Sequence, residues 1–434
     1  MQEKGTRGGT LQMILAALVF TICFVVWGGV AALAPVFKEL YHLSASQVAL
    51  LVAVPTLLGS VARFPLGILS DRFGGRLVFS VLMVILLAPV GLMSLTNSYV
   101  SVLAVAFFIG LAGASFAIGV PFVSGWFPPS RQGTALGIYG LGTGGTAISA
   151  LVLPRVANGY GLPYAFLVLL PVLALALVVF FLMARNAPTF KPSKVPVREK
   201  LAVIKRKPMS WVLALFYFVT FGGFVALGSY MPTFLVSEYG LTKAGAGGYA
   251  SLFILTSVLA RPLGGILADR VKPTSILTGV FLLGAALQIV LAFQPTLTVL
   301  IATFLVIAVL LGLGSGAVFK LVGSQFSKDA GVVGGMVGTI GGLGGFFPPL
   351  LMGMVKDATG TYALGFMLLS WFALICIVVN VLVLQRLVFG RRGSGTRAAG
   401  PAAPEIPAGL AASIVPNGAA QRAAGEERGL SQRV

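Results

Sequence analysis

Two arginines, Arg63 and Arg261, stand inside apolar segments at the same place in a motif that the chain contains twice. The first copy reads RFPLGILSDRFGGR and the second RPLGGILADRVK, at an offset of 198 positions. An arginine within lipid is costly, and its guanidinium stays protonated in proteins. Two such cations at equivalent places in a duplicated chain indicate a positively charged chamber between two halves.

The chemistry that fits such a chamber is the binding of an anion. A guanidinium presents parallel N–H donors that match a planar oxyanion, and a lysine has no such fork. By the spans predicted below, all 11 Asp and Glu residues lie in loops, tails or helix ends. We therefore expect no intramembrane acid to neutralise the two arginines, so their charge is balanced only when an anion enters.

Composition places these arginines in a membrane protein. Of the 434 residues, 57% are hydrophobic and 9% are charged, whereas a soluble domain carries roughly 25% charged residues. Apolar runs of roughly 20 residues, enough for a helix to cross the hydrocarbon core, recur along the chain. The predicted spans are 11–34, 45–69, 75–96, 99–122, 131–154, 163–184, 209–236, 246–268, 273–293, 296–320, 330–355 and 362–387. We therefore predict an all-α membrane protein with twelve transmembrane helices.

The basic excess is spread unevenly over the predicted loops. The chain carries 30 Lys and Arg against 11 Asp and Glu, a net charge of +19. Only four of these cations fall in predicted external loops: Lys38, Arg155, Lys243 and Lys356. The positive-inside rule then places both termini in the cytoplasm. Membrane topology explains the charge, and we expect no nucleic-acid partner.

Four segments follow from these spans. Residues 1–184 and 209–388 are predicted to form two pseudo-symmetric six-helix bundles, because their motifs repeat at one offset. Residues 185–208 carry eight basic residues, one acid and four prolines, which indicates a cytoplasmic linker. Residues 389–434 are rich in Ala, Gly, Pro and Arg and cannot bury a core, so we expect a disordered basic cytoplasmic tail.

Glycine stripes mark the fifth and eleventh predicted helices. Spacings of three and four put their members on one helical face: Gly133, Gly137, Gly140 and Gly144, then Gly331, Gly335, Gly338 and Gly342. Glycine costs about 1 kcal/mol against alanine in a water-exposed helix, so such a row needs a reason. Close packing of helices is one reason, and contact of the glycine backbone with a small ligand is another. Farther along, Gly344, Gly345 and Pro348 predict a break in the eleventh helix.

Two further features have competing interpretations. Phe20, Phe24 and Trp27 share one face of the first helix, where facing lipid or packing is favoured over lining a cavity. Lys320 lies near the cytoplasmic end of its predicted helix. Its side chain either reaches the membrane surface or takes part in ion passage.

The end of the second predicted helix resembles the loop between helices 2 and 3 of the major facilitator superfamily. The motif residues are Gly67, Asp71, Arg72, Gly74 and Arg76, and the second copy supplies Asp269 and Arg270. The glycines permit a tight turn, and Asp71 can pair with a nearby cation or with the N-terminus of another helix. We predict a conformational latch between the bundles rather than a substrate site.

The chain resembles the nitrate/nitrite porter family of that superfamily over about residues 10–388. Besides the paired arginines, the resemblance rests on GIYGLGTGGT (137–146), FGGFVALGSYMPTFL (221–235), GAVFKLV (316–322) and GVVGGMVGTIGGLGGFFPP (331–349). The latch loop is a less specific sign of this family, because drug and sugar carriers also have it.

The resemblance implies roles for particular residues. Arg63 and Arg261 grip the anion, and the hydroxyl of Tyr217 hydrogen-bonds to it. Phe116 and Phe221 press on the flat faces of the anion. The two glycine stretches slide past neighbouring helices as the halves rock.

Three residues of the glycine stretches complete the implied substrate-binding set: Thr143, Gly144 and Gly342. The family commonly carries an asparagine where this chain has Thr143. A threonine keeps a donor and an acceptor but loses the amide, so the departure bears on anion selectivity more than on the fold.

The expected function is transport of nitrate, nitrite or both by alternating access, with exchange of the two anions favoured. The carboxylates that usually carry protons in secondary transporters are missing from the predicted spans. Proton-coupled nitrate symport is the alternative, and it would use Lys320, Tyr217 or protonation of the anion itself. Another small anion, such as a carboxylate, is a further alternative substrate, and a drug or sugar exporter fits less well.

Other classes of protein are disfavoured. No metal-ligand cluster, nucleophile–base pair or phosphate loop stands out in the sequence, so we expect neither an enzyme nor a cofactor. A transporter-like sensor has no support in the composition of the tail. The expected partners are a small inorganic anion and the lipid bilayer. We expect a monomer in the plasma (inner) membrane, with many membrane passes.

Overall fold

The computed structural model describes residues 8–193, 208–326 and 330–384, and every regular element in these ranges is helical. Twelve helical spans in these ranges are long and apolar enough to cross a membrane, as the sequence predicts. Their ends differ from the predicted ends by a few residues. The longest difference is at the first span, Gly9–Tyr41, which continues past the predicted end at 34.

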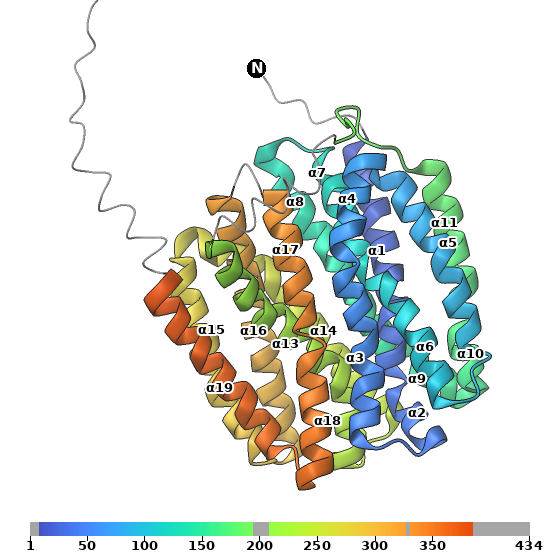
Figure 1. The fold of residues 1–434 in the computed structure, drawn as a ribbon, viewed down its shortest axis with the longest axis vertical. Coiled ribbons are helices and arrows are strands. Elements are labelled where there is room, and N and C mark those ends of the chain that lie inside the picture. The colour runs from blue at the N-terminus through green and yellow to red at the C-terminus, as the bar shows by residue number, and fades with distance from the viewer. Residues whose placement is uncertain (1–7, 194–207, 327–329, 385–434) are drawn as a thin grey trace, which may run out of the picture. The chain divides into compact units, whose positions relative to one another are not determined.

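The first half of the chain supplies six of these spans from short helical pieces (Figure 1). In order they are α1 (Gly9–Ala32), α2 (Ala34–Tyr41), α3 (Ala45–Val61), α4 (Arg63–Phe73), α5 (Gly75–Met93), α6 (Tyr99–Ile109), η1 (Gly110–Ala114), α7 (Ser115–Ser124), α8 (Pro129–Gly140), η2 (Leu141–Gly144), α9 (Gly145–Tyr160), α10 (Leu162–Leu167) and α11 (Leu169–Met183).

The second half supplies the other six spans, from fewer and longer helices (Figure 1). They are α13 (Pro208–Tyr239), α14 (Lys243–Arg270), α15 (Pro273–Ala292), α16 (Leu297–Gln325), α17 (Ala330–Leu343), α18 (Phe347–Thr359), α19 (Ala363–Val379) and η3 (Asn380–Leu384). Most of the predicted linker, residues 194–207, and all of the predicted tail, residues 389–434, lie outside the described residues.

Local sequence explains where several helices start and turn. Ser44 caps α3 by accepting the backbone N–H of Gln47, and the side-chain oxygen of Gln47 accepts the backbone N–H of Ser44. Ser98 begins α6 in the same way with Ser101. Gly74 has a φ of 86°, a backbone conformation that favours glycine, and it allows the tight turn from α4 to α5.

The predicted break in the eleventh span is confirmed. Helix α17 ends at Leu343 and α18 begins at Phe347, so Gly344 and Gly345 lie in the turn between them. The fifth span also changes its winding, because η2 is a 3₁₀ segment at the end of the first glycine stripe. Both glycine-rich spans are therefore irregular along their length, and in the eleventh span the backbone N–H groups of Gly344 and Gly345 donate to carbonyls three residues earlier.

The two halves pack against each other through α3 with α18 and through α9 with α14. These contacts lie toward the predicted external end, which carries α2 and the end of α18 at the bottom of Figure 1. A Cβ on Gly247 would overlap the carbonyl oxygen of Ala150, and one on Gly353 would lie 2.5 Å from the Cβ of Ala49. Glycine is therefore required at both crossings, because the backbones meet directly.

Polar contacts reinforce this closed end. The carboxylate of Asp357, at the end of α18, accepts the backbone N–H groups of Ala45 at 3.0 Å and Ser46 at 2.8 Å. An anionic side chain at the N-terminus of α3 is favourable because the helix dipole and the free N–H groups both attract it. Two more links join the halves here, Lys38 to Ser237 and Lys243 to Glu39.

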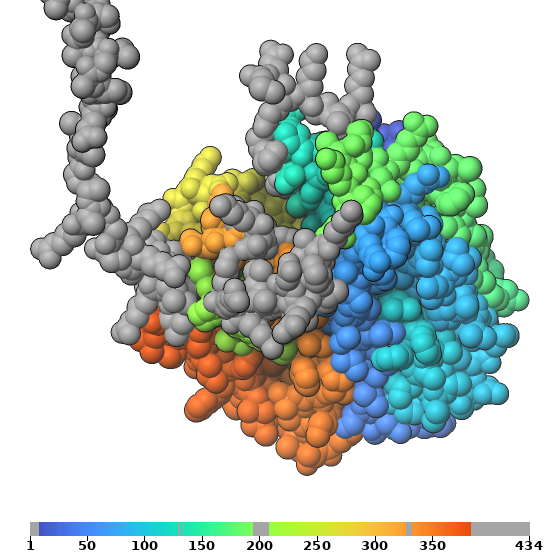
Figure 2. Space-filling model, turned by 45° about the horizontal axis from the view of Figure 1, so that its top comes forward, coloured from blue at the N-terminus to red at the C-terminus, as the bar shows by residue number. Residues whose placement is uncertain are grey.

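The opposite, predicted cytoplasmic end is packed more loosely around the glycine stripes. A Cβ on Gly137, Gly140, Gly335 or Gly338 would meet nothing within 4 Å. Close packing, one of the two explanations for the stripes, is thus not realised at these four positions in this conformation. Figure 2 brings this end forward, with the first half in blue to green and the second half in yellow to orange on opposite sides of the view.

Some glycines of these spans do pack tightly, including Gly342 of the second stripe and two that lie beside the stripes. Gly142 has no room for a side chain because the ring of Phe20 in α1 fills the space beside it. The ring of Tyr217 in α13 fills the corresponding space beside Gly341. In each half, one glycine-rich span therefore rests against the first helix of its own bundle. The stripe itself is left facing the other bundle.

Candidate functional site

Arg63 is the first residue of α4, directly after the irregular joint that separates α4 from α3. Only 3% of the residue is exposed. Its Nε–H donates to the carbonyl of Gly113 at 3.2 Å, and Nη1 donates to the carbonyl of Gly338 at 2.7 Å. The second of these bonds crosses from the first bundle to α17 of the second.

Arg261 lies in the middle of α14 and has different surroundings. Its Nε and Nη2 atoms are buried, and neither has a hydrogen-bond partner among the described residues. These two nitrogens form one edge of the guanidinium, from which two N–H bonds point in parallel. Buried donors without partners are rare in proteins, and this pair has the geometry that binds two oxygens of a planar anion.

The ring of Phe221 in α13 lies close to both arginines. Its ring centroid lies 5.1 Å from Cζ of Arg63 and 4.8 Å from Cζ of Arg261. The two guanidinium carbons are therefore at most 9.9 Å apart, the sum of these distances. Phe224, one turn farther along, also lies under Arg261 at 5.0 Å. Ring faces attract these cations, which helps to hold two like charges in one buried place.

Neither guanidinium is paired with a carboxylate within the described part of the chain. The described acids are all near helix ends, as predicted: Glu39, Asp71, Glu238, Asp269 and Asp357. Two unneutralised cations are thus buried between the bundles, at the place where the sequence predicts a chamber. An anion that enters it removes an electrostatic cost that the empty protein bears.

Tyr217 shares this chamber. It is buried, its ring stacks on Phe221 with centroids 4.9 Å apart, and Phe319 meets it edge-on at 4.9 Å. The same ring fills the space beside Gly341. Tyr217 therefore fixes the position of Phe221 and the distance between α13 and α17.

Phe116 lies in a separate aromatic cluster of the first bundle. Its ring contacts Phe20 at 5.7 Å and Tyr139 at 6.0 Å. Both arginines lie on Phe221, so the two predicted phenylalanines do not hold equivalent positions in this conformation.

The predicted residues of the glycine stretches contact protein groups in this conformation. Thr143 is 2% exposed, and its hydroxyl donates to the carbonyl of Gly140 at 2.9 Å. A Cβ on Gly144 would lie 3.9 Å from Leu255 of the other bundle. One on Gly342 would overlap the hydroxyl of Ser60, so a side chain there would displace α17 from the arginine.

The predicted latch residues lie away from the chamber. Arg76 donates from Nη2 to the carbonyl of Phe181 at 2.8 Å, and its guanidinium lies over that ring. Arg72 lies over Phe73 at 5.4 Å. The carbonyl of Asp71 accepts the N–H of Ser193 at 3.0 Å. A Cβ on Gly67 would come no closer than 3.8 Å to Ala117, so this glycine has spare room.

Lys320 forms an ion pair with Asp269, and both side chains are about half exposed. The pair joins α16 to α14 within the second bundle. Asp269, predicted with Arg270 as part of an inter-bundle latch, therefore makes a contact inside one bundle in this conformation. Lys320 is not an isolated cation here, because an acid of its own bundle faces it.

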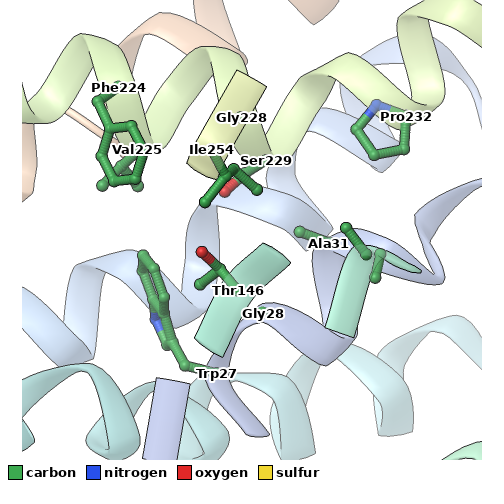
Figure 3. Close-up of a pocket in the computed structure, with 12 residues that line it drawn as sticks. Trp27, Gly28, Ala31, Thr146, Phe224, Val225, Gly228, Ser229, Pro232 and Ile254 are labelled. Carbon is green, nitrogen blue, oxygen red and sulfur yellow. The ribbon is translucent and has the colours of Figure 1, made fainter. Parts of the chain in front are cut away.

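A cavity that neither arginine lines lies between α1, α9, α13 and α14, on the predicted external side of Phe224. Figure 3 shows Trp27 and Thr146 on one side, facing Phe224, Val225 and Ser229 on the other. The less favoured interpretation of the first-helix aromatics therefore holds for Trp27, which lines a cavity. Phe20 and Phe24 are fully buried packing residues.

Several groups that surround the arginines could not be identified from the sequence. The carbonyls of Gly113 and Gly338 carry no side chain, so only the fold identifies them as partners of Arg63. Phe224 shares a helical face with Phe221, and its spacing of three was a usable signal. Ser60, one turn before Arg63, looked like any small residue of a packed helix.

The amino-acid sequence matches the family model of the Major Facilitator Superfamily over residues 15–349 and again over 234–411. A nitrite extrusion protein of Bacillus subtilis (strain 168) is 42% identical over 374 residues, 86% of this chain and 93% of that protein. The probable nitrate/nitrite transporter NarK2 of Mycobacterium tuberculosis (strain ATCC 25618 / H37Rv) is 36% identical over 87% of this chain and 97% of its own length. The probable nitrate transporter NarT of Staphylococcus carnosus (strain TM300) is 37% identical, over 86% and 95%.

Solved structures resemble the chain in fold. A bacterial homologue of the human lysosomal transporter Spinster, in an inward-facing and occupied conformation, gives a TM-score of 0.68 at 17% identity, covering 88% of this chain and 98% of that one. The human organic anion transporter MFSD10 (TETRAN) gives 0.65 at 16% identity, covering 86% and 99%. At such identities the likeness concerns the fold alone.

Proposed function

Because the chain belongs to the Major Facilitator Superfamily, and within it to the group of its nitrate and nitrite transporter relatives, we propose that it carries nitrate and nitrite across the membrane by alternating access. In the favoured mode one anion enters as the other leaves. The family consists of transporters, so the chain is not an enzyme. It is a multi-pass protein of the plasma membrane.

The observation that carries this proposal is the unpartnered edge of Arg261 beside Arg63 and Phe221. Nitrate and nitrite are small, flat and negative, and two of their oxygens match the two parallel N–H bonds of that edge. Arg63 supplies the second positive charge from the other bundle. Both bundles of one chain complete the site, which supports the monomer as the transporting unit.

The other proposed site residues differ in how directly they contact the anion. Tyr217 and Phe221 border the anion directly, the first with its hydroxyl and the second with its ring. Phe116, Thr143 and Gly144 are assigned by resemblance, and they contact protein groups in this conformation. Gly342 keeps α17 close to Arg63 because it has no side chain.

Alternating access requires an inward-facing and an outward-facing conformation. The packing of the bundles supports the inward-facing one here. With both termini in the cytoplasm, as the charge distribution predicts, the closed end is external and this conformation faces inward. In the outward-facing conformation residues 1–184 and 209–388 rock as two bodies about the arginines. The glycine stripes then close the cytoplasmic end, and the latch residues then link the bundles: Gly67, Asp71, Arg72, Arg76, Asp269 and Arg270.

Exchange is favoured over proton symport because no described acid lies within the chamber. The two buried cations repel each other in the empty carrier, so a bound anion lowers the cost of enclosing them between the bundles as the conformation changes. Proton symport would need an ionisable group along the transport path. The half-exposed Lys320–Asp269 pair at the predicted cytoplasmic end is the described candidate for it.

Transport by the purified full chain in proteoliposomes tests the proposal. Labelled nitrate outside should accumulate when nitrite is enclosed, and should not accumulate when the vesicles enclose neither anion. Accumulation that needs an imposed pH gradient and ignores internal nitrite would instead establish symport. Competition by chloride, formate and oxalate identifies a different substrate if one of them displaces nitrate more effectively than nitrite does.

A further inference from the structure

Ser60 carries a buried hydroxyl for which the fold provides no partner. The residue is 1% exposed, and its Oγ has no hydrogen-bond partner in the described part of the chain. Three buried serines of the described residues have a hydroxyl without a partner, Ser60, Ser257 and Ser315, whereas others donate to a carbonyl, as Ser149 does to Thr146. A buried hydroxyl without a bond in a native structure calls for an explanation, and an absent ligand is one.

The position of Ser60 supports a ligand as the explanation. It lies three residues before Arg63, on nearly the same side of the second span, and both side chains face Gly342 of α17. The Oγ of Ser60 and the Nη1 of Arg63 both lie within 2.8 Å of the place that a Cβ on Gly342 would take. The two atoms are therefore at most 5.6 Å apart, twice that distance.

This separation suits one shared acceptor. Two hydrogen bonds of about 2.9 Å each can meet at a single oxygen when their donors are closer than about 5.8 Å. Nη1 carries two N–H bonds, of which one goes to Gly338. An anion oxygen can thus accept the second N–H of Arg63 and the O–H of Ser60 together.

We propose that Ser60 is an additional anion ligand that favours nitrate over nitrite, an inference that rests on the proposed function. Two oxygens of either anion bind the free edge of Arg261. Nitrate has a third oxygen, which points across the chamber and accepts from Arg63 and Ser60. Nitrite has only two oxygens, so it leaves the hydroxyl of Ser60 without a partner.

Binding of nitrate and nitrite to the purified full chain tests this role. In Ser60→Ala the affinity for nitrate should fall about tenfold, the effect expected for a hydrogen bond to a charged group, and that for nitrite less than twofold. Ser60→Cys keeps the volume and a weak donor, and it should give an intermediate loss. Ser370→Ala is the matched control, because Ser370 is as buried and donates to Ala285, away from the arginines.

The ratio of the two affinities separates ligation from packing. An equal loss for both anions, or an unchanged affinity for nitrate, overturns the role of Ser60 and leaves the transport proposal standing. If the unmodified chain binds neither anion, the proposed function itself fails. Thermal unfolding of each variant shows that the comparison is made on folded protein, and Ser60→Cys serves if Ser60→Ala does not fold.

Discussion

Arg63 and Arg261 are the same side chain at equivalent places in the two bundles, but they are bound differently. Two carbonyls orient Arg63, while the Nε–Nη2 edge of Arg261 meets no described partner. Arg63 is thus held in position before an anion arrives, and Arg261 has donors to offer it. This difference leads us to expect that the two arginines contribute unequally to affinity.

Replacing each arginine by lysine tests the fork geometry. Arg261→Lys keeps the charge but removes the paired N–H bonds, so nitrate affinity should fall roughly 10- to 100-fold, from the loss of about 1.5–3 kcal/mol for a bond to a charged group. Arg63→Lys should abolish transport, because a lysine cannot donate to the carbonyls of Gly113 and Gly338 with the geometry of the guanidinium. Uptake into proteoliposomes and equilibrium binding measure the two effects.

A surface arginine provides the control for these variants. Arg155→Lys, at an exposed position of α9, should leave transport unchanged. The variants should insert and unfold like the unmodified protein, because the charge in the chamber is retained. Near-normal uptake by both Arg63→Lys and Arg261→Lys would contradict a bidentate grip on the anion.

At the scale of elements, the glycine stripes of α8 and α17 have room that their neighbours do not use. Four of their members could carry a Cβ without a contact in this conformation, whereas Gly142 and Gly341 beside them could not. A helix pays an entropic penalty for each glycine, so an unused row of them indicates a contact made elsewhere in the cycle. The outward-facing conformation, with the cytoplasmic end closed, is where we expect that contact.

Gly335→Ala tests this expectation because it adds one methyl group to the open face of α17. The inward-facing conformation should be unaffected, so nitrate binding from the cytoplasmic side should stay within twofold of normal. Closure of that end should be hindered by overpacking, which costs about 1–3 kcal/mol, so exchange should slow roughly tenfold or more. Counterflow of labelled nitrate against nitrite gives the rate.

Gly284→Ala is matched to this variant, because a Cβ on Gly284 of α15 also meets nothing within 4 Å and the residue is outside the stripes. Its exchange rate should be normal. Equal slowing in both variants would assign the effect to helix propensity instead of to closure.

At the scale of the molecule, the conformation is a balance between contacts at its two ends. Asp357 links α18 to the N-terminus of α3 across the bundles, and Gly247 and Gly353 allow close backbone contact beside it. All of these contacts must separate when the external end opens. Each therefore stabilises the conformation described here relative to the outward-facing one.

Asp357→Asn should shift this balance toward the outward-facing conformation. Removing a charge at a helix N-terminus costs about 0.3–1 kcal/mol, up to a fivefold change in the ratio of the two conformations. A cysteine placed at Ser229, which lines the external cavity, should then react up to several-fold faster with a membrane-impermeant thiol reagent added outside. Background labelling is low because Cys23 and Cys376 are buried.

Glu238→Gln is the control for this charge removal. Glu238 pairs with Lys356 inside the second bundle, so its loss should leave external labelling unchanged. Faster labelling in both variants would point to general loosening, and none in Asp357→Asn would remove Asp357 from the gate.

Properties that depend on local hydropathy, charge and repetition could be predicted from the amino-acid sequence. The twelve spans, the break after Leu343, the turn at Gly74 and the place of the acids at helix ends all follow from runs of neighbouring residues. The two arginines could be singled out because a charge within an apolar run is conspicuous wherever the chain folds. Tyr217 and Phe221 were reached on a different ground, the family resemblance of their stretch of sequence.

Which groups those arginines contact depends instead on the packing of helices that are distant in the sequence. The bond from Arg63 to Gly338 joins residues 275 positions apart, through a backbone carbonyl that every residue has. That Phe221 lies beside both cations, that Lys320 faces Asp269, and that the glycine stripes stand open depend on how two bundles pack in one conformation. Such contacts are set by the relative position of whole helices, which a pattern within one helix does not specify.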